Sequence, residues 1–169
     1  MKHTYSGSYG SIRLIPMSLE QSQEYRQMRN KPENRDYFIN TGEISQEEQA
    51  AWYREYVNRP GDYLFAVCHK SVYFIGGCGI YHVNETYREA EFGRILIDKR
   101  WSGKGCGYRT VMAACGIAEM NLKLKRLVLH VREENIPAFK IYKKAGFAVI
   151  GNSREGILEM EKKLCCDRK

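Results

Sequence analysis

The 169-residue sequence predicts an α/β fold with a mixed, mostly antiparallel sheet flanked by helices, in one domain that spans residues 1–169. Between residues 90 and 131 an apolar strand, a glycine-rich loop, a helix and a second apolar strand follow one another. This order is typical of a parallel βαβ unit. Pairs of strand-like segments with short connections lie on both sides of it and predict antiparallel hairpins. The chain is long enough to bury a sizeable core.

The first sixty residues are expected to contain one strand and two helices. Residues 11–15 read as the strand. The helices begin at Ser18 and Ser45, because each serine is followed three residues later by a Gln or Glu that completes a capping box. The polar segment 35–42 between the two helices is expected to be a loop beside the functional site.

The rest of the chain alternates between strands and helices. Residues 127–131 are almost all apolar, as expected of a central strand buried on both faces. The other expected elements are a hairpin (63–69 and 72–83), a strand (90–98), a helix from the glycine loop to about 120, a helix (135–145) and a final antiparallel pair (147–151 and 157–163).

The glycine-rich loop is the most informative stretch. Glycine stands at positions 103, 105 and 107, between an apolar strand and a helix. Glycines let a backbone approach a ligand closely, and the free N–H groups at a helix start attract anions. The loop fits neither the G-x-x-x-x-G-K-[ST] nor the G-x-G-x-x-G phosphate-binding pattern. We interpret it as a cradle for a phosphate or pyrophosphate, with a simple tight turn as the alternative.

The positive charge of the chain is concentrated around this loop in the sequence. The formal net charge is +7, and residues 99–132 contain eight Lys or Arg residues but a single acid, Glu119. This excess equals the net charge of the whole chain. Either a polyphosphorylated small ligand or a nucleic acid would explain it. Because no RNA-binding aromatic signature and no basic recognition helix is present, the sequence favours the small ligand.

Several classes of protein are disfavoured. No apolar run has the length of a membrane span, and the first residues carry no apolar signal region. The six cysteines form no C-x-x-C pair, so we expect reduced thiols in a cytoplasmic protein rather than a disulfide framework or a metal site.

Two motifs resemble those of the GNAT superfamily of N-acetyltransferases. The segment Ser102–Gly107 is similar to the pyrophosphate loop of that family, [QR]-x-x-G-x-[GA], with Ser102 in place of Gln or Arg. A second segment is similar to the family signature N-x-x-A-x-x-x-Y-x-x-x-G-F. The matching residues are Asn135, Ala138, Tyr142, Gly146 and Phe147. The first sixty residues look like the subgroup that contains ribosomal-protein and amino-sugar N-acetyltransferases.

The resemblance implies a coenzyme A site. The main chain of Ile95 and Ile97 would pair with the pantetheine, Asn135 would hydrogen-bond nearby, and Tyr142 would lie close to the sulfur. The sheet would splay between strands 90–98 and 127–131, with the acetyl thioester of acetyl-CoA in the gap. The implied pyrophosphate contacts are Ser102, Gly103, Lys104, Gly105, Cys106, Gly107 and Tyr108.

The implied reaction is direct attack of a primary amine on the thioester. An alkylamine is protonated at neutral pH and must lose a proton, and the departing thiolate gains from one. Glu91 is the predicted base, with a surface glutamate as the alternative, and Tyr142 is the predicted acid, with a core tyrosine as the alternative. We expect the histidines His82 and His130 to be structural.

The acceptor is less well specified by the sequence. The predicted acceptor wall consists of Arg29, Tyr37, Phe38, Trp52 and Tyr53, although the aromatic stripe of the second helix also fits a packed core face. Aromatic rings beside an arginine favour an amino sugar nucleotide, with a protein N-terminus as runner-up. A non-catalytic acyl-CoA sensor and an RNA-binding protein remain alternatives. We expect a small-molecule or peptide amine partner and leave a homodimer open.

Overall fold

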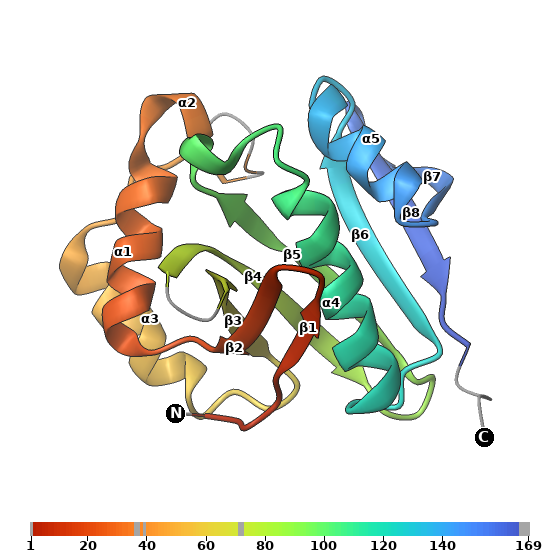
Figure 1. The fold of residues 1–169 in the computed structure, drawn as a ribbon, viewed down its shortest axis with the longest axis horizontal. Helices are drawn as coiled ribbons and strands as arrows, with labels where there is room; N and C mark the ends of the chain where they lie inside the picture. Colours follow the sequence, from red (N-terminus) through yellow and green to blue (C-terminus); the bar gives the residue numbers. More distant parts are fainter. Residues whose placement is uncertain (1, 36–37, 39, 71–72, 166–169) are drawn as a thin grey trace.

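The computed structural model describes residues 2–35, 38, 40–70 and 73–165. These residues contain eight strands and five α-helices. Figure 1 shows their α/β arrangement. The elements are β1 (Gly7–Tyr9), β2 (Ile12–Pro16), α1 (Leu19–Asn30), α2 (Pro32–Arg35), α3 (Gln46–Tyr56), β3 (Tyr63–His69), β4 (Tyr73–Asn84), β5 (Glu89–Ile97), the 3₁₀ turn η1 (Lys99–Trp101), α4 (Cys106–Met120), β6 (Arg126–Arg132), α5 (Ile136–Lys144), β7 (Ala148–Arg154) and β8 (Ile157–Lys163).

One sheet contains all eight strands in the order β1-β2-β3-β4-β5-β6-β8-β7. Every neighbouring pair is antiparallel except β5 and β6, which are parallel. The β5–β6 pairing covers only three positions and ends at Glu91 opposite Val128. Beyond this point the two strands separate. The predicted mixed sheet, splayed between its two parallel strands, is therefore confirmed.

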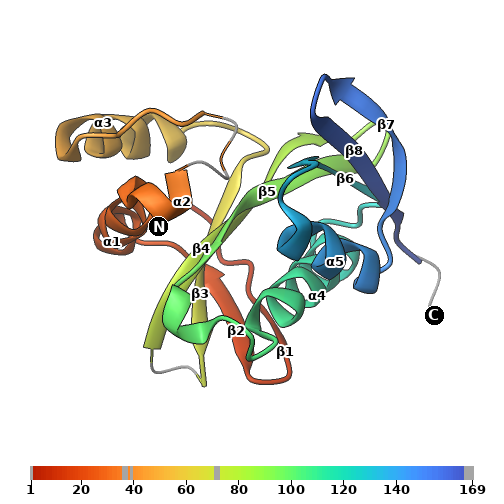
Figure 2. The same cartoon turned by 90° about the horizontal axis from the view of Figure 1, so that it is seen from above.

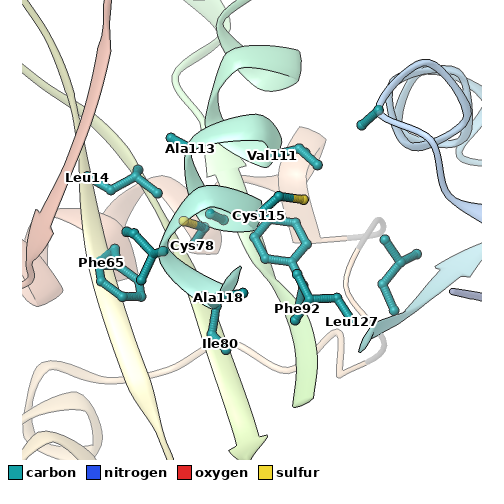
Figure 3. Close-up of a cluster of buried hydrophobic side chains, with 14 of the residues drawn as sticks. Leu14, Phe65, Cys78, Ile80, Phe92, Val111, Ala113, Cys115, Ala118 and Leu127 are labelled. Carbon is teal, nitrogen blue, oxygen red and sulfur yellow. The ribbon is translucent and has the colours of Figure 1, made fainter. Parts of the chain in front are cut away.

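Helices cover both faces of the sheet. Helices α1, α2 and α3 lie on one side and α4 and α5 on the other, as Figure 2 shows. The main core lies between α4 and the sheet, where Leu14, Phe65, Ile80 and Phe92 are all buried (Figure 3). A smaller core lies beneath α1 and α3. The two helical layers therefore flank the point at which the sheet opens.

The expected elements are present, with small additions. Both capping boxes form: the Ser18 and Ser45 hydroxyls accept hydrogen bonds from the backbone N–H groups three residues on, at 3.1 Å each. Three elements were not predicted from the sequence: β1, α2 and η1. Each of these has no more than four residues, which is too short for a hydrophobic period to be visible. The predicted strand 72–83 begins at a residue outside the described part.

Candidate active site

A cleft of about 1330 Å³ opens where β5 and β6 separate. Its lining comes from the α1–α3 region on one side, from the glycine loop, α4 and α5 on the other, and from β4, β5 and β6 between them. Most small-molecule pockets have volumes of roughly 300–1,000 Å³. The cleft is therefore large enough for an extended cofactor together with a second substrate. We call its two sides the loop side and the α1–α3 side.

The loop side is a backbone cradle. Gly103 and Gly105 have φ angles of +72° and +74°, a conformation that L-residues rarely adopt. Gly105 is the N-cap residue of α4, and no side chain caps this helix. The first N–H groups of the helix, at residues 106–108, have no intrahelical partner and attract negative charge. The geometry therefore fits a pyrophosphate, as expected of coenzyme A.

Most of the predicted cofactor residues line the cleft. The lining includes Ile95, Ile97, Ser102, Gly103, Gly105, Cys106, Gly107, Tyr108, Asn135 and Tyr142. Lys104 is absent from it: its ammonium lies 5.1 Å from the centre of the Trp101 ring, and its carbonyl accepts a hydrogen bond from Arg109. The Asn135 Oδ1 caps α5 by accepting from the Ala138 N–H, which leaves its amide nitrogen as the available donor.

The cations beside the cradle differ in part from those expected. Lys99, Lys140 and Lys144 line this side, and the Lys144 ammonium lies 4.8 Å from the centre of the Tyr108 ring. Lys123 and Lys125, which belong to the basic stretch of the sequence, follow the opposite end of α4, about 22 Å away for a 15-residue helix. Charge that is clustered in the sequence is therefore only partly clustered in space.

Tyr142 places a phenol at the cleft from helix α5. Its ring packs edge-on against Phe92 and Phe147. Its hydroxyl has no hydrogen-bond partner among the described residues, yet it is not one of their enclosed, unsatisfied polar atoms. Burial, with the nearby Cys78, raises the pKa of the phenol well above 10. Tyr142 is therefore a protonated donor that is open to the cleft.

Glu91 is the centre of a hydrogen-bonded cluster on β4, β5 and β6. Its Oε1 accepts from the Tyr81 hydroxyl at 2.9 Å and from the His130 Nδ1 at 3.2 Å. Its Oε2 accepts from the His82 Nδ1 at 3.1 Å. Burial and the Glu91 carboxylate raise the pKa of Tyr81 strongly. The two histidines expected to be merely structural thus meet the predicted base, a contact between residues that are 39 positions apart in the case of His130.

The predicted acceptor wall is only partly assembled as expected. Arg29, Phe38 and Trp52 line the cleft. Tyr53 does not: it is buried in the smaller core, and its hydroxyl donates to the Met17 carbonyl at 2.8 Å. Tyr37 lies outside the described residues. The alternative interpretation of the aromatic stripe, a packed core face, therefore holds for Tyr53.

The arginines of the cleft are already engaged. Arg29 is buried, donates to the carbonyls of Asn40 and Gly42, and lies against the Phe38 ring, so burial lowers its pKa. Arg94 forms two hydrogen bonds with Asp62, at 2.6 and 3.1 Å, and stacks on Tyr81.

The third arginine of the cleft, Arg132, donates to the Phe38 carbonyl and pairs with Glu134. Neither Arg94 nor Arg132 was predicted from the sequence as a site residue. A bulge in β5 and the β6 register bring them to the cleft, and no local motif marks either feature.

On the α1–α3 side, the acidic side chains have fewer hydrogen-bond and ion-pair partners than the arginines. Glu33, Glu43 and Glu48 line it, and Glu91 lies where it meets the sheet. The first three are exposed. Glu43 makes a 3.6 Å ion pair with Arg35, and one oxygen of Glu48 accepts from the Ser45 N–H. The exposed charged side chains of the cleft are therefore lysines on the loop side and glutamates on the α1–α3 side, where the arginine Arg29 is buried.

The geometry defines a class of protein: a splayed sheet with a helix-start anion cradle and a buried phenol at the gap, as in enzymes that transfer an acyl group from coenzyme A. The family model of the acetyltransferase (GNAT) domain matches residues 11–148. The chain belongs to this family. It is an N-acetyltransferase, and its cofactor is acetyl-CoA, as the resemblance implied.

Characterised relatives act on small amines. The chain is 24% identical over 142 residues to the L-amino acid N-acetyltransferase AaaT of Escherichia coli (strain K12), covering 80% of this chain and 83% of the relative. It is 28% identical over 142 residues to a spermidine N(1)-acetyltransferase of the same strain, covering 83% and 75%.

Solved structures share the fold. A spermidine N-acetyltransferase from Vibrio cholerae in complex with CoA and spermine superimposes with a TM-score of 0.84 at 22% identity, covering 90% of this chain and 95% of that one. A ribosomal L7/L12 alpha-N-protein acetyltransferase in complex with coenzyme A gives 0.81 at 14% identity, covering 95% and 98%. Both similarities show the fold alone.

Two further observations concern the described residues. None of their helices combines the length and the apolar character needed to cross a membrane. They also contain no group of three or more histidine, cysteine or acidic side chains placed to hold a metal ion.

Proposed function

We propose that this enzyme acetylates a small aliphatic amine that carries additional positive charge, such as a polyamine. The observation that carries the proposal is the charge of the α1–α3 side, where Glu33, Glu43 and Glu48 line the cleft and Glu91 stands at the gap. A polycation needs several carboxylates, and this arrangement offers them along one wall. The similarity to a spermidine N(1)-acetyltransferase supports the same class of acceptor.

The amino sugar nucleotide predicted from the sequence is not supported. That prediction required Arg29 to pair with a nucleotide phosphate beside aromatic rings. Both terminal nitrogens of Arg29 instead donate to backbone carbonyls, and Phe38 covers its guanidinium. Releasing this side chain for a phosphate would leave the two carbonyls without their donors. The relatives described above are named for an L-amino acid, spermidine and a ribosomal protein as acceptors, not for a sugar.

An amino acid acceptor is the second candidate, because of the similarity to an L-amino acid N-acetyltransferase. Such a substrate needs a cation for its carboxylate. Within the described part of the chain, the cleft arginines Arg29, Arg94 and Arg132 all have partners already. We therefore rank a cationic amine above an amino acid as the acceptor. A protein N-terminus ranks third, because its only support is the similarity in fold to a ribosomal-protein acetyltransferase.

The residues of the cleft divide the chemistry between them. The cofactor supplies the acetyl group as a thioester and takes the leaving pair of electrons on sulfur. The cradle at residues 103–108 holds its pyrophosphate, Tyr142 gives a proton to the departing thiolate, and the Glu91 cluster lies where the incoming amine loses a proton. Retention of both groups favours an enzyme over a non-catalytic sensor, and we propose one catalytic domain over residues 1–169.

An amine panel with acetyl-CoA tests the proposal, with release of free CoA thiol as the signal. We expect spermidine or a shorter diamine to give the highest kcat/KM, ahead of L-amino acids, a ribosomal N-terminal peptide and a 4-amino sugar nucleotide. The kcat/KM for spermidine and the diamine should also fall with added salt, because salt screens the glutamates of the cleft. A higher kcat/KM for the sugar nucleotide or an amino acid would refute the proposed class of acceptor.

A further inference from the structure

His130 and Glu91 meet at the point where the sheet opens. The last paired position between β5 and β6 is Glu91 opposite Val128. Side chains alternate along a strand, so His130 lies on the same face of β6 as Val128, one step further towards the gap. Leu127, Leu129 and the other alternate residues of β6 are buried in the core on the α4 face. His130 therefore belongs to the acceptor face of the sheet, and it lines the cleft.

The hydrogen bonds of Glu91 occupy most of its carboxylate. A carboxylate has about four lone-pair sites. Three of them are taken, by Tyr81, His82 and His130. A single site is left on Oε2, and a proton taken there would weaken the carboxylate as an acceptor for its three present donors. The cluster is better suited to holding a negative charge in place than to exchanging protons with a substrate.

The hydrogen bond to Glu91 also determines which tautomer neutral His130 adopts. Because a carboxylate only accepts, the Nδ1 of neutral His130 must carry the hydrogen, and Nε2 is then the basic nitrogen. Nε2 has no partner among the described residues, and it is not one of their enclosed, unsatisfied polar atoms. On a side chain that lines the cleft, this nitrogen faces the space where an amine would arrive.

We propose that His130 is the general base of the reaction and that Glu91 is a positioning residue that orients its ring. The incoming ammonium gives one proton to His130 Nε2, directly or through one water, and the resulting imidazolium is stabilised by the Glu91 carboxylate. The neutral amine then attacks the thioester carbon, the C–S bond breaks, and the thiolate takes the proton of Tyr142. The second amine proton restores the Tyr142 phenol, and His130 releases its proton to solvent.

Other charges face His130 from the neighbouring strands. Glu159 on β8 is its register partner across the sheet. On β6 itself, Arg132 points to the same face and is bound to Phe38 and Glu134. His82 on β4 reaches Glu91 from solvent, with 77% of its side chain exposed. Glu159 does not line the cleft, so it offers a control for loss of a nearby charge without loss of the Nδ1 contact.

The test compares pH profiles of kcat/KM. His130→Asn keeps a donor for Glu91 but has no base, so kcat/KM should fall about 10²- to 10⁴-fold and the acid limb of the profile should disappear. Free imidazole should restore part of the rate to His130→Ala, a recovery that a structural role would not give. Glu159→Gln should stay within about twofold of wild type. Calorimetry with CoA verifies that each variant retains its cofactor site.

Glu91→Gln decides between the two possible bases. Its amide oxygen still accepts from His130, so a positioning role predicts a loss of about tenfold in kcat/KM, with the acid limb of the profile retained because His130 is still present as the base. A complete loss of rate in Glu91→Gln together with a normal profile in His130→Asn would overturn the proposal.

The inference rests on amine acetylation but not on the choice of amine. The assay uses whichever amine the wild-type enzyme turns over fastest, so failure of the cationic-amine proposal would leave this test intact.

Discussion

The two sides of the cleft are built in different ways. The loop side is made of backbone: two left-handed glycines and the free N–H groups of one helix start, all within residues 103–108. The α1–α3 side and the opening of the sheet are made of side chains from several elements, each held by partners distant in sequence, as Arg94 is by Asp62 and Glu91 by His130. The proposed cofactor site therefore depends on local geometry, whereas the proposed acceptor site depends on a surface that only the complete fold assembles.

The largest effect is expected from the loop side. Gly105→Glu should abolish acetyl-CoA binding, because Gly105 has a φ of +74° and a new carboxylate would occupy and repel the phosphate position. Calorimetric titration with acetyl-CoA measures this. Gly156→Glu is the matched control: its φ is +72°, it lies in the β7–β8 turn, and a Cβ added there would meet no neighbouring atom within 4 Å. Normal binding by a folded Gly105→Glu protein would show that the cradle is only a turn.

The second largest effect is expected at Tyr142, which lies between the two sides of the cleft. Tyr142→Phe should lower kcat about tenfold to a thousandfold and leave the affinity for acetyl-CoA nearly unchanged, because only the phenolic proton is lost. Since burial raises the pKa of Tyr142 above 10, the phenol stays protonated, and wild-type activity should show no alkaline decline from this group up to pH 10.

Tyr56→Phe provides the control for Tyr142→Phe. Tyr56 is a buried tyrosine outside the cleft, and its hydroxyl accepts from the Leu64 N–H. Its variant should lose about 1 kcal/mol of stability and keep its kcat. Equal kcat values for Tyr142→Phe and wild type across the pH range would leave Tyr142 with a packing role alone.

A third, smaller effect tests the acidic wall. Glu48→Gln should raise KM for a cationic amine severalfold at low salt and leave kcat unchanged. A glutamine can still complete the capping box, as Gln21 does in α1, so the helix should be unaffected. Glu47→Gln removes the same charge one residue away from the lining and is the control. Equal KM values for the two variants would attribute any effect to net charge rather than to the wall.

The contrast between the two sides of the cleft also explains which features could be predicted from the sequence. The βαβ unit, both capping boxes and the glycine loop are local patterns, and each lies where it was predicted. The role of the loop as a cofactor cradle stays a prediction. The partner of Glu91 could not be found this way, because it depends on the register of β5 against β6. A one-residue shift would turn His130 into the core. Arg29 was identified as a cleft residue, but its capture by two loop carbonyls follows from tertiary structure alone.

The smallest expected effect separates two adjacent aromatic residues of α3. Trp52 lines the cleft, whereas the Tyr53 hydroxyl donates to the Met17 carbonyl in the smaller core. Tyr53→Phe should therefore lower the free energy of unfolding by about 1 kcal/mol, as expected for one lost hydrogen bond, which is roughly 2–4 °C in Tm for a domain of this size. The KM for the amine should not change, because the ring keeps its position and faces away from the acceptor. Denaturant titration and steady-state kinetics on the same preparation measure both quantities. A rise in KM without loss of stability would return Tyr53 to the acceptor wall, where the sequence first placed it.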